Sequence, residues 1–231
     1  MSPLPDGIIR TPDGVFVLRD DTHLSRHIER WFRLDIEYQF LHELAPYVPE
    51  GGVVIDAGAC LGDHALTWSQ MVGATGKVFC FEPHPLTFQA LRLNMDRLVN
   101  VACLNCALGD RNAELPFQRD PNIGASYMAA VGTEKVWVDT LDNLLEIERL
   151  TRLDFIHLDA EGYETFILRG AREVIRRFRP AMMLEYCPAH MARAGLLSED
   201  LKAELDGLGY AIHALPGQDH PQQRDILCLP K

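Results

Sequence analysis

Three short segments carry residues whose types and spacing could bind a ligand and act on it. The first is DAGACLG, where Asp56 ends an apolar run and Gly58 and Gly62 bracket the turn that follows. Glycine lets the backbone approach a ligand closely and turn tightly into a helix, whose first amide groups are then free. A dinucleotide fingerprint would also need glycine at two positions that hold Cys60 and Asp63. Because Asp63 adds negative charge where a pyrophosphate would lie, the pattern favours a cofactor without phosphates.

The second segment is FCFEP, in which Glu82 ends the next apolar run. An acidic side chain at this place can accept hydrogen bonds from both hydroxyl groups of a ribose. A carboxylate exposed to solvent at a strand end is the alternative. The DxGxxxG pattern upstream lies at the distance that a nucleoside site requires, so we expect Glu82 to bind a ribose and Pro83 to fix the turn after it.

Four further residues are candidates for contacts with the same nucleoside cofactor. Asn105 and Ala107 end a third apolar run, where an adenine edge would lie, and either Asn105 or the local main chain could bind it. Ala59 lies within the glycine turn. His64 occupies the first turn of the following helix, where it could contact the far end of the cofactor or pack in the core.

The third segment, HLDAEGYE, supplies the candidate catalytic residues. Asp159 should lie at the end of a central strand, and Glu161 in the turn after it. His157 shares a strand face with Asp159 by the two-residue alternation of side chains. If the cofactor donates a methyl group to an oxygen, the reaction needs close approach and often a base for the acceptor hydroxyl. Asp159 could orient the acceptor, bind an ammonium group of the cofactor or ligate a divalent cation, and Glu161 could contact the acceptor or the metal.

Two residues of this segment have structural alternatives. Glu164 is better explained as a carboxylate in the first turn of a helix, where the helix dipole favours it. His157 could equally be a base or a buried histidine held by a hydrogen bond. Other residues that could form walls of an acceptor pocket, or a loop over it, are Ser126, Tyr127, Glu185, Tyr186 and His190.

Alternating strands and helices must position these segments. Apolar runs predict buried strands at 53–56, 77–81, 101–106, 154–158 and 181–185, and shorter ones at 115–117 and 136–138. Helical periodicity and capping residues predict helices at 63–72, 85–98, 164–178 and 198–208, the last with Ser198 as its N-cap. Two final strands, at 210–215 and 225–229, have no helix between them and should pair antiparallel.

This order predicts an α/β fold with a mainly parallel sheet and helices on both faces. The antiparallel strand at the end separates methyltransferase-type sheets from dinucleotide-binding Rossmann sheets. We therefore expect a Rossmann-like domain over 49–231. Residues 1–48 form an N-terminal extension, with a hairpin in GIIRTPDGVFVL and an amphipathic helix around 34–44. This extension could pack across the strand ends as a lid or acceptor wall.

Composition limits the partners of this 231-residue chain, whose net charge is −11. A nucleic-acid partner would need a basic stripe, so we expect none. No apolar run reaches the ~20 residues that cross a bilayer, and MSPLPDGIIRTPDG lacks the basic region and apolar stretch of a secretory signal. We therefore expect a cytoplasmic protein without a membrane partner. Scattered cysteines without a second CxxC pair argue against a zinc site. The basic residues that cluster in one predicted helix fit its solvated face, and they are Arg169, Arg172, Arg176, Arg177 and Arg179.

Taken in order, several segments resemble the FkbM-type methyltransferases: VVIDAGACLGDHAL, FCFEPHPLTFQALRLN, NCALGD, VDTLDNLL, DFIHLDAEGYETFILRGA and RPAMMLEY. The resemblance covers roughly residues 50–188. It implies the class I methyltransferase fold, with a mainly parallel seven-stranded sheet that includes a C-terminal antiparallel strand. It also implies S-adenosyl-L-methionine as the methyl donor and a hydroxyl acceptor on a sugar, polyketide or other small metabolite.

Residue by residue, the resemblance assigns the glycine loop to the cofactor, Glu82 to its ribose, and the acidic turn from Asp159 to Glu164 to the family's DxEGxE block. The chain departs from the family pattern at two positions. Cys60 stands where asparagine is usual, a change that should leave cofactor binding intact. His157 stands where lysine is usual, and this change bears on the identity of the acceptor and on proton transfer. An NAD-type oxidoreductase and a non-catalytic nucleoside-binding protein are the alternative functions.

Overall fold

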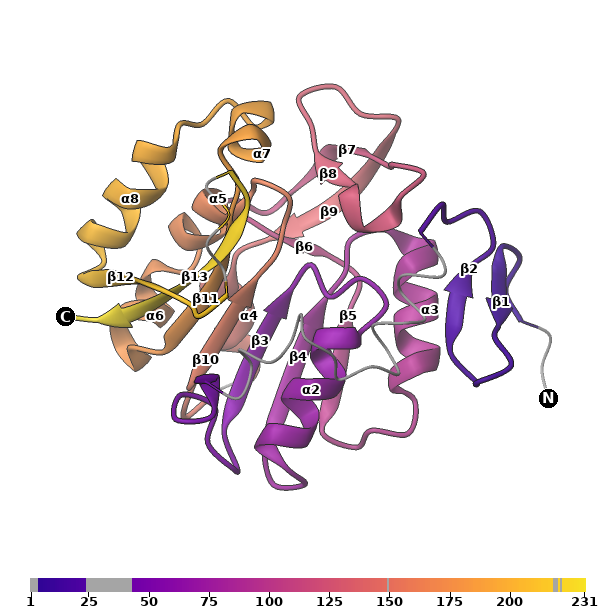
Figure 1. Ribbon diagram of the computed structural model, residues 1–231, viewed down its shortest axis with the longest axis horizontal. Helices are drawn as coiled ribbons and strands as arrows, with labels where there is room; N and C mark the ends of the chain where they lie inside the picture. Colours follow the sequence, from indigo (N-terminus) through magenta and orange to yellow (C-terminus); the bar gives the residue numbers. More distant parts are fainter. Residues whose placement is uncertain (1–3, 24–42, 149, 218–219, 221) are drawn as a thin grey trace.

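The computed structural model describes residues 4–23, 43–148, 150–217, 220 and 222–231. Within them the largest sheet has seven strands in the order β12-β13-β11-β10-β3-β4-β5 (Figure 1). β13 pairs antiparallel with both of its neighbours, while β3, β4, β5, β10 and β11 run parallel. The predicted class I sheet and its antiparallel strand are therefore confirmed. The strands are β3 (Val53–Ala57), β4 (Lys77–Phe81), β5 (Val101–Leu104), β10 (Phe155–Leu158), β11 (Ala181–Tyr186), β12 (Tyr210–Ala214) and β13 (Arg224–Pro230).

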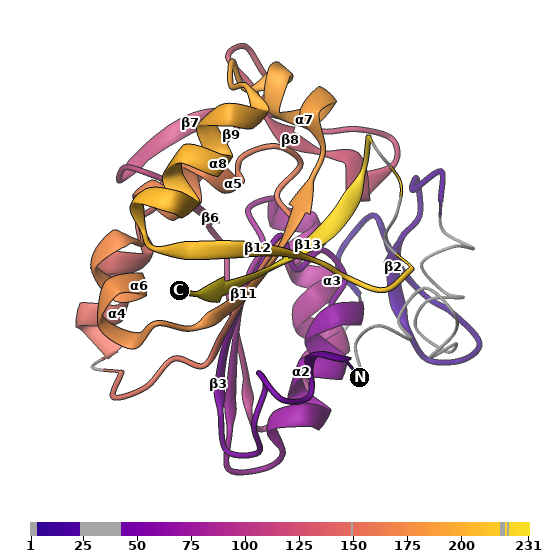
Figure 2. The same cartoon turned by 60° about the vertical axis from the view of Figure 1, so that its left-hand side comes forward.

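Helices cover both faces of this sheet (Figure 2). One face holds α2 (Asp63–Val72) and α3 (Pro85–Met95). The other holds α4 (Leu141–Glu148), α5 (Glu164–Arg169), α6 (Arg172–Phe178) and α8 (Ser198–Gly207), and the short α7 (Pro188–Arg193) follows β11. Among the described residues no helix is long and apolar enough to cross a bilayer.

Side chains alternate along each central strand between two hydrophobic cores, as the period of a strand requires. Val54 and Phe155 pack with α2, whereas Ile55 and Ile156 pack with the helices on the other face. This alternation, together with the register of β3 against β10, also decides where the polar residues at the strand ends point. The six cysteines are free thiols.

The helix predicted over 164–178 is two helices, α5 and α6, so that prediction was wrong. A Cβ atom on Gly170, between them, would lie 1.8 Å from the carbonyl oxygen of Gly109, because the two backbones touch there. The carboxylate of Asp142 on α4 then accepts two backbone N–H groups at the start of α6, at 2.9 and 3.1 Å. This cap comes from a distant part of the chain.

Two other predicted helix ends also moved. The helix predicted to 98 ends at Met95. Ser198 is not the N-cap of α8, because Leu197 holds that position and its N–H donates to Asp200 Oδ2 at 2.7 Å. The carboxylate of Asp200, three residues after the N-cap, accepts the N–H of the N-cap residue, as an acidic N3 residue does in a capping box.

A second sheet of four strands lies over the carboxyl ends of the main sheet (Figure 1). Its order is β6-β9-β7-β8. The short strands predicted at 115–117 and 136–138 are confirmed as parts of β7 and β9, but their assembly into a separate sheet was not predicted. The run predicted as one strand over 101–106 divides, because β5 ends at Leu104. The strands are β6 (Ala107–Leu108), β7 (Ala113–Gln118), β8 (Tyr127–Met128) and β9 (Glu134–Asp139).

The predicted N-terminal hairpin is confirmed as β1 (Ile8–Arg10) and β2 (Phe16–Leu18). It packs against α3 at the edge of the molecule (Figure 1), where Val17 contacts the apolar cluster that contains Ala90. Most of the amphipathic helix predicted around 34–44 lies outside the described residues.

Candidate functional site

A recess lies between the carboxyl ends of the main sheet and the second sheet. Its empty volume, including the part open to solvent, is about 580 Å³, which is the size of a small-molecule site. Ligands of open α/β sheets bind at this edge. The wall consists of Ala57, Gly58, Cys60, Phe81, Glu82, Pro83, Ala107, Leu108, Phe117, Ile123, Gly124, Ser126, Tyr127, Met128, Asp159, Ala160, Glu161, Tyr163 and Ile167.

The glycine loop after β3 reaches the recess because two of its residues carry no side chain. Gly58 has φ of +82°, and a Cβ atom there would lie 1.8 Å from the carbonyl oxygen of Asp159. The N–H groups of Gly58 and Ala59 both donate to Phe81, at 3.0 and 3.1 Å. Gly62, with φ of +97°, caps α2 and lies against side chains of α3. These contacts hold the loop against β4, the acidic turn and α3.

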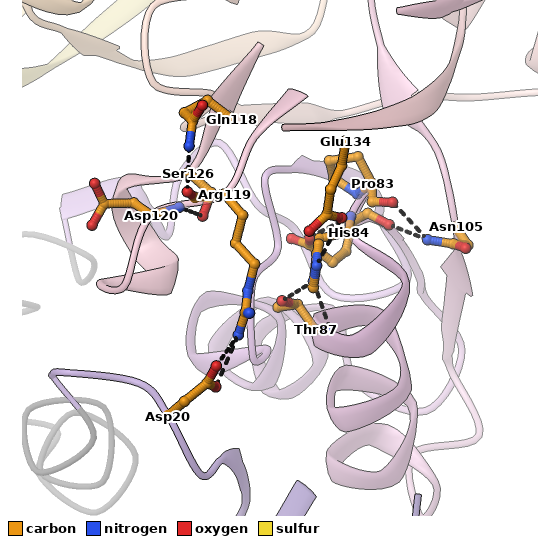
Figure 3. Close-up of polar contacts among 11 residues, drawn as sticks. Asp20, Pro83, His84, Thr87, Asn105, Gln118, Arg119, Asp120, Ser126 and Glu134 are labelled. Carbon is orange, nitrogen blue, oxygen red and sulfur yellow. Dashed lines mark hydrogen bonds and ion pairs between the residues drawn. The ribbon is translucent and has the colours of Figure 1, made fainter. Parts of the chain in front are cut away.

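Glu82 is buried at the end of β4 and lines the recess. Its two carboxyl oxygens accept the N–H groups of His84, at 2.9 Å, and Cys60, at 3.1 Å. Burial raises the pKa of Glu82 to about 8, although these two hydrogen bonds favour the ionised form. The Asn105 amide donates to the carbonyl oxygens of Glu82 and Pro83 at 2.9 and 3.0 Å (Figure 3). Asn105 thus fixes the turn and does not line the recess.

Contacts from the second sheet and the N-terminal hairpin brace this side of the recess (Figure 3). His84 caps α3 and bonds Thr87 Oγ1 at 3.0 Å, and its Nε2 lies 3.3 Å from a carboxylate oxygen of Glu134 on β9. Arg119 after β7 pairs with Asp20 after the hairpin at 2.7 Å. The hairpin therefore contacts the loop that carries Ser126 and Tyr127 into the recess.

The acidic turn after β10 brings Asp159 and Glu161 to the recess wall. Burial, and then the neighbouring carboxylates, raise the pKa of Asp159 well above its usual range. Glu164 is buried and points back into the turn, where it accepts the N–H groups of Ala160 at 2.9 Å and Gly162 at 3.2 Å. Burial raises the pKa of Glu164 to about 7. Glu164 therefore shapes the turn and does not line the recess.

His157 and Asp56 lie together under α2, away from the recess. Both are buried, and His157 Nδ1 lies 2.7 Å from Asp56 Oδ1. The rings of His64 and Trp68 pack on His157, with centroids 4.5 and 5.6 Å away. Of the two interpretations of His157, the structure shows the buried, hydrogen-bonded histidine. The side chains of Asp56 and His64 likewise do not line the recess.

Beside the recess, Glu161 joins two residues that the sequence suggested only as pocket walls. His190 Nδ1 lies 2.9 Å from Glu161 Oε2 and 3.1 Å from Glu185 Oε2. These hydrogen bonds raise the pKa of His190 to about 10. Arg193 donates to Glu161 at 2.8 Å, and Gln223 to Glu185 at 2.8 Å. Two carboxylates and one imidazole from three separate elements thus meet at one edge of the recess.

Several wall residues were missed in the sequence. Phe117, Leu108 and Met128 line the recess through the second sheet, and no pattern in their segments marks them. Tyr163 belongs to the HLDAEGYE segment and could have been proposed from its position beside Glu161. Tyr186, which was proposed, is buried and packs under Arg224, with 4.8 Å between the guanidinium and the ring centroid.

The family model described as the methyltransferase FkbM domain matches residues 56–212. This stretch includes the glycine loop, Glu82 and the acidic turn. The chain belongs to the FkbM methyltransferase family. The resemblance seen in the sequence is therefore confirmed over most of the chain.

Curated relatives of this FkbM-family chain include two methyltransferases. The chain is 29% identical over 144 residues to the hexuronic acid methyltransferase AglP of Haloferax volcanii, covering 61% of this chain and 58% of that protein. It is 26% identical over 147 residues to the 2-O-methyltransferase NoeI of Sinorhizobium fredii, covering 55% and 60%. The chain thus spans about three fifths of the length of these relatives.

Solved structures share the fold of this FkbM-family chain. A methyltransferase FkbM from Methylobacillus flagellatus superimposes with a TM-score of 0.55 and 18% identity, covering 78% of this chain and 44% of that one. A putative rRNA-methylase from Clostridium thermocellum gives a TM-score of 0.52 and 12% identity, covering 86% and 97%. At these identities the likeness establishes the class I methyltransferase fold.

Proposed function

We propose that this chain is an S-adenosylmethionine-dependent methyltransferase that methylates a hydroxyl group of a sugar or another small metabolite. The observation that carries the proposal is the acidic lining of the recess. Its described wall holds three carboxylates, from Glu82, Asp159 and Glu161, and no basic side chain. Such a wall suits a ligand with a sulfonium and an ammonium group and opposes a pyrophosphate. This contrast supports a methyl donor over NAD.

The recess residues fit this cofactor in further ways. Glu82 presents both carboxyl oxygens near the recess and can accept the two ribose hydroxyls. Gly58 keeps the loop free of a side chain where the backbone must pass close to a ligand. Ala107 lies on the wall near Pro83, beside the expected adenine position. When bound, S-adenosylmethionine supplies an electrophilic methyl group.

The acidic turn is the proposed place of the acceptor. Asp159 and Glu161 lie on the recess wall, where carboxylates can hold an ammonium group, orient a hydroxyl and accept its proton. We assign the ammonium group and the orientation of the acceptor to Asp159, and the outer acceptor contact to Glu161. His157 lies outside the recess, and its proposed role is to support the fold with Asp56.

A small acceptor is favoured over a nucleic acid because several arginines of the cluster are held by partners within the protein. Arg172 binds Glu204 through two hydrogen bonds of 2.6 and 2.7 Å, and Arg169 lies 3.6 Å from the same carboxylate. Arg179 donates to two carbonyl oxygens at the end of α8. With a net charge of −11, the chain has no excess of basic residues for phosphates. The name of AglP, a hexuronic acid methyltransferase, agrees with a sugar acceptor, and the name of NoeI, a 2-O-methyltransferase, agrees with transfer to oxygen.

Calorimetric titration with S-adenosylmethionine, S-adenosylhomocysteine and NAD tests the cofactor. We expect both S-adenosyl compounds to bind and NAD to fail. Binding of NAD alone would refute the proposal in favour of an oxidoreductase. If the S-adenosyl compounds bind but no acceptor in a panel of sugars and metabolites takes up a tritiated methyl group, the chain is instead a nucleoside-binding protein without this activity.

Asp159→Asn tests the acidic turn once an acceptor is found. We expect turnover to fall at least ~100-fold, because the positioned carboxylate is lost. Asp96→Asn, at an exposed residue after α3, is the matched control and should keep wild-type turnover. Unchanged turnover of Asp159→Asn would contradict the role assigned to this carboxylate.

A further inference from the structure

A cluster of metal-ligating side chains lies at the edge of the recess. We call Glu161, Glu185 and His190 the carboxylate–imidazole cluster. One ligand atom from each residue lies within 4.8 Å of the ligand atoms of the other two. In the described part of the chain, no other three or more Asp, Glu, His or Cys side chains form such a group. The three residues come from the turn after β10, the end of β11 and α7. Figure 2 shows α7 above the carboxyl end of β11.

The spacing of these atoms matches the spacing of ligands around one ion. Neighbouring ligands of an octahedral ion, at about 2.1 Å from the metal, lie about 3.0 Å apart. In the cluster, His190 Nδ1 lies 2.9 Å from one carboxylate oxygen and 3.1 Å from the other. When an ion displaces the proton of His190 Nδ1, small adjustments of the side chains would bring all three ligand atoms onto that ion. Arg193 donates to the same oxygen, Glu161 Oε2, that lies 2.9 Å from His190 Nδ1, and this oxygen has lone pairs for both the guanidinium and the ion.

The surroundings hold the three ligands in place. A Cβ atom on Gly162 would lie 2.4 Å from the backbone of His190, so the acidic turn lies directly against α7. Glu185 is buried, and Gln223 binds its second oxygen at 2.8 Å. Such hydrogen bonds from a second layer of residues orient ligating carboxylates in metal sites. Ligands held in this way lose little conformational entropy when an ion binds.

We propose that the carboxylate–imidazole cluster binds one divalent transition-metal ion beside the recess. A mixed set of two carboxylates and one imidazole suits Mn²⁺, Co²⁺ or Zn²⁺, whereas Mg²⁺ and Ca²⁺ prefer oxygen ligands alone. Because Glu161 also lines the recess, the remaining coordination positions can take the acceptor hydroxyl, whose acidity a bound ion increases. This last step rests on the proposed methyl transfer, whereas the binding of the ion does not.

Binding of Mn²⁺ to the chelator-treated full chain tests the site without cofactor or acceptor. The loss of the free Mn²⁺ signal in electron paramagnetic resonance measures the bound ion. We expect one Mn²⁺ per chain, displaced by Co²⁺ and Zn²⁺ and poorly by Mg²⁺. Glu185→Gln and His190→Gln should each weaken binding at least ~10-fold. Glu199→Gln, at an exposed glutamate of α8, is the matched control and should bind as wild type does.

A second measurement uses only the wild-type chain, so it tests the site even if the variants fail to fold. In the wild-type chain, bound Mn²⁺ should broaden first the amide resonances of Gly162, Tyr186 and Met191, which adjoin the three ligands in sequence. No bound Mn²⁺ in the wild type, or broadening only elsewhere, would overturn the proposal and leave the cluster as an internal ion pair only. Because neither measurement involves methyl transfer, failure of the proposed enzymatic function would not affect this result.

Discussion

Replacing Glu82 with glutamine tests the recess most directly, because both carboxyl oxygens of Glu82 are used in the free protein. They accept N–H groups of His84 and Cys60 at 2.9 and 3.1 Å. In Glu82→Gln an NH₂ group must face one of these donors, and the ribose loses an acceptor. An unpaired buried polar group costs about 1–3 kcal/mol, so cofactor affinity should fall about 5- to 150-fold.

The pKa of Glu82 also predicts how the affinity for the cofactor depends on pH. The pKa of Glu82 in the free protein is about 8, and ribose hydroxyls donate to the ionised carboxylate. From about pH 6.5 to about pH 8.5 the ionised fraction rises from about 3% to about 75%, so affinity should rise about 25-fold. Stability of the free protein changes in the opposite direction. Folding raises the pKa of Glu82 from its ordinary value of 4.5. The contribution of Glu82 to the free energy of unfolding is therefore complete at a pH below 4.5 and is lost as the pH rises toward about 8.

Calorimetry with 5′-methylthioadenosine measures this effect, because the probe keeps the ribose and has no amino-acid group to titrate. Wild type should show the rise in affinity, and Glu82→Gln a flat profile. Glu114→Gln, at an exposed residue of β7, is the matched control and should follow wild type. A 2′,3′-dideoxy analogue of the probe should lose the pH dependence. A flat wild-type profile, or an unchanged slope in Glu82→Gln, would refute the proposed ribose contact.

Two further substitutions test the packing behind the recess. Gly58→Ala places a Cβ atom 1.8 Å from a backbone oxygen at positive φ, and should abolish 5′-methylthioadenosine binding in calorimetry. Gly207→Ala is the control, because no atom lies within 4 Å of a Cβ atom at that position. It should raise the free energy of unfolding in urea by about 0.4–1 kcal/mol. Normal binding by Gly58→Ala would contradict the close approach of Gly58 to the backbone of Asp159. His157→Phe leaves the buried carboxylate of Asp56 without its partner and should lower that free energy by about 3–5 kcal/mol. Adding Asp56→Leu should restore part of the loss, and a His157→Phe protein as stable as wild type would show that the pair contributes nothing.

Much of the candidate site could be predicted because its signals are local. Gly58, Glu82 and Asp159 each follow an apolar run that reads as a buried strand, and the carboxyl ends of parallel strands meet at one edge of a sheet. All three residues line the recess. The loop with Ser126 and Tyr127 was also suggested by its turn-forming residues, and it lines the recess as well.

The positions of His157 and Asp56 could not be predicted from the sequence. Alternation placed His157 on a strand face, but the face turns toward α2, where Asp56 of the neighbouring strand lies opposite in register. The sequence around His157 does not show that a carboxylate of the neighbouring strand lies opposite it. A buried histidine and a catalytic one would have the same local sequence before an acidic turn. The pairing register of distant segments decides whether it serves catalysis or the core.

The sequence by itself determined the main-sheet strands, the helices α2, α3 and α8, the antiparallel final strand and the acidic, glycine-bearing strand ends, because periodicity and turn residues act over a few neighbours. Tertiary structure alone decided the rest. It divided 164–178 into two helices through the contact of Gly170 with Gly109, and it placed the second sheet over the recess. It also brought Glu185 and His190 to Glu161. Such contacts join residues far apart in the chain, so packing and strand register determine them, and no local pattern records them.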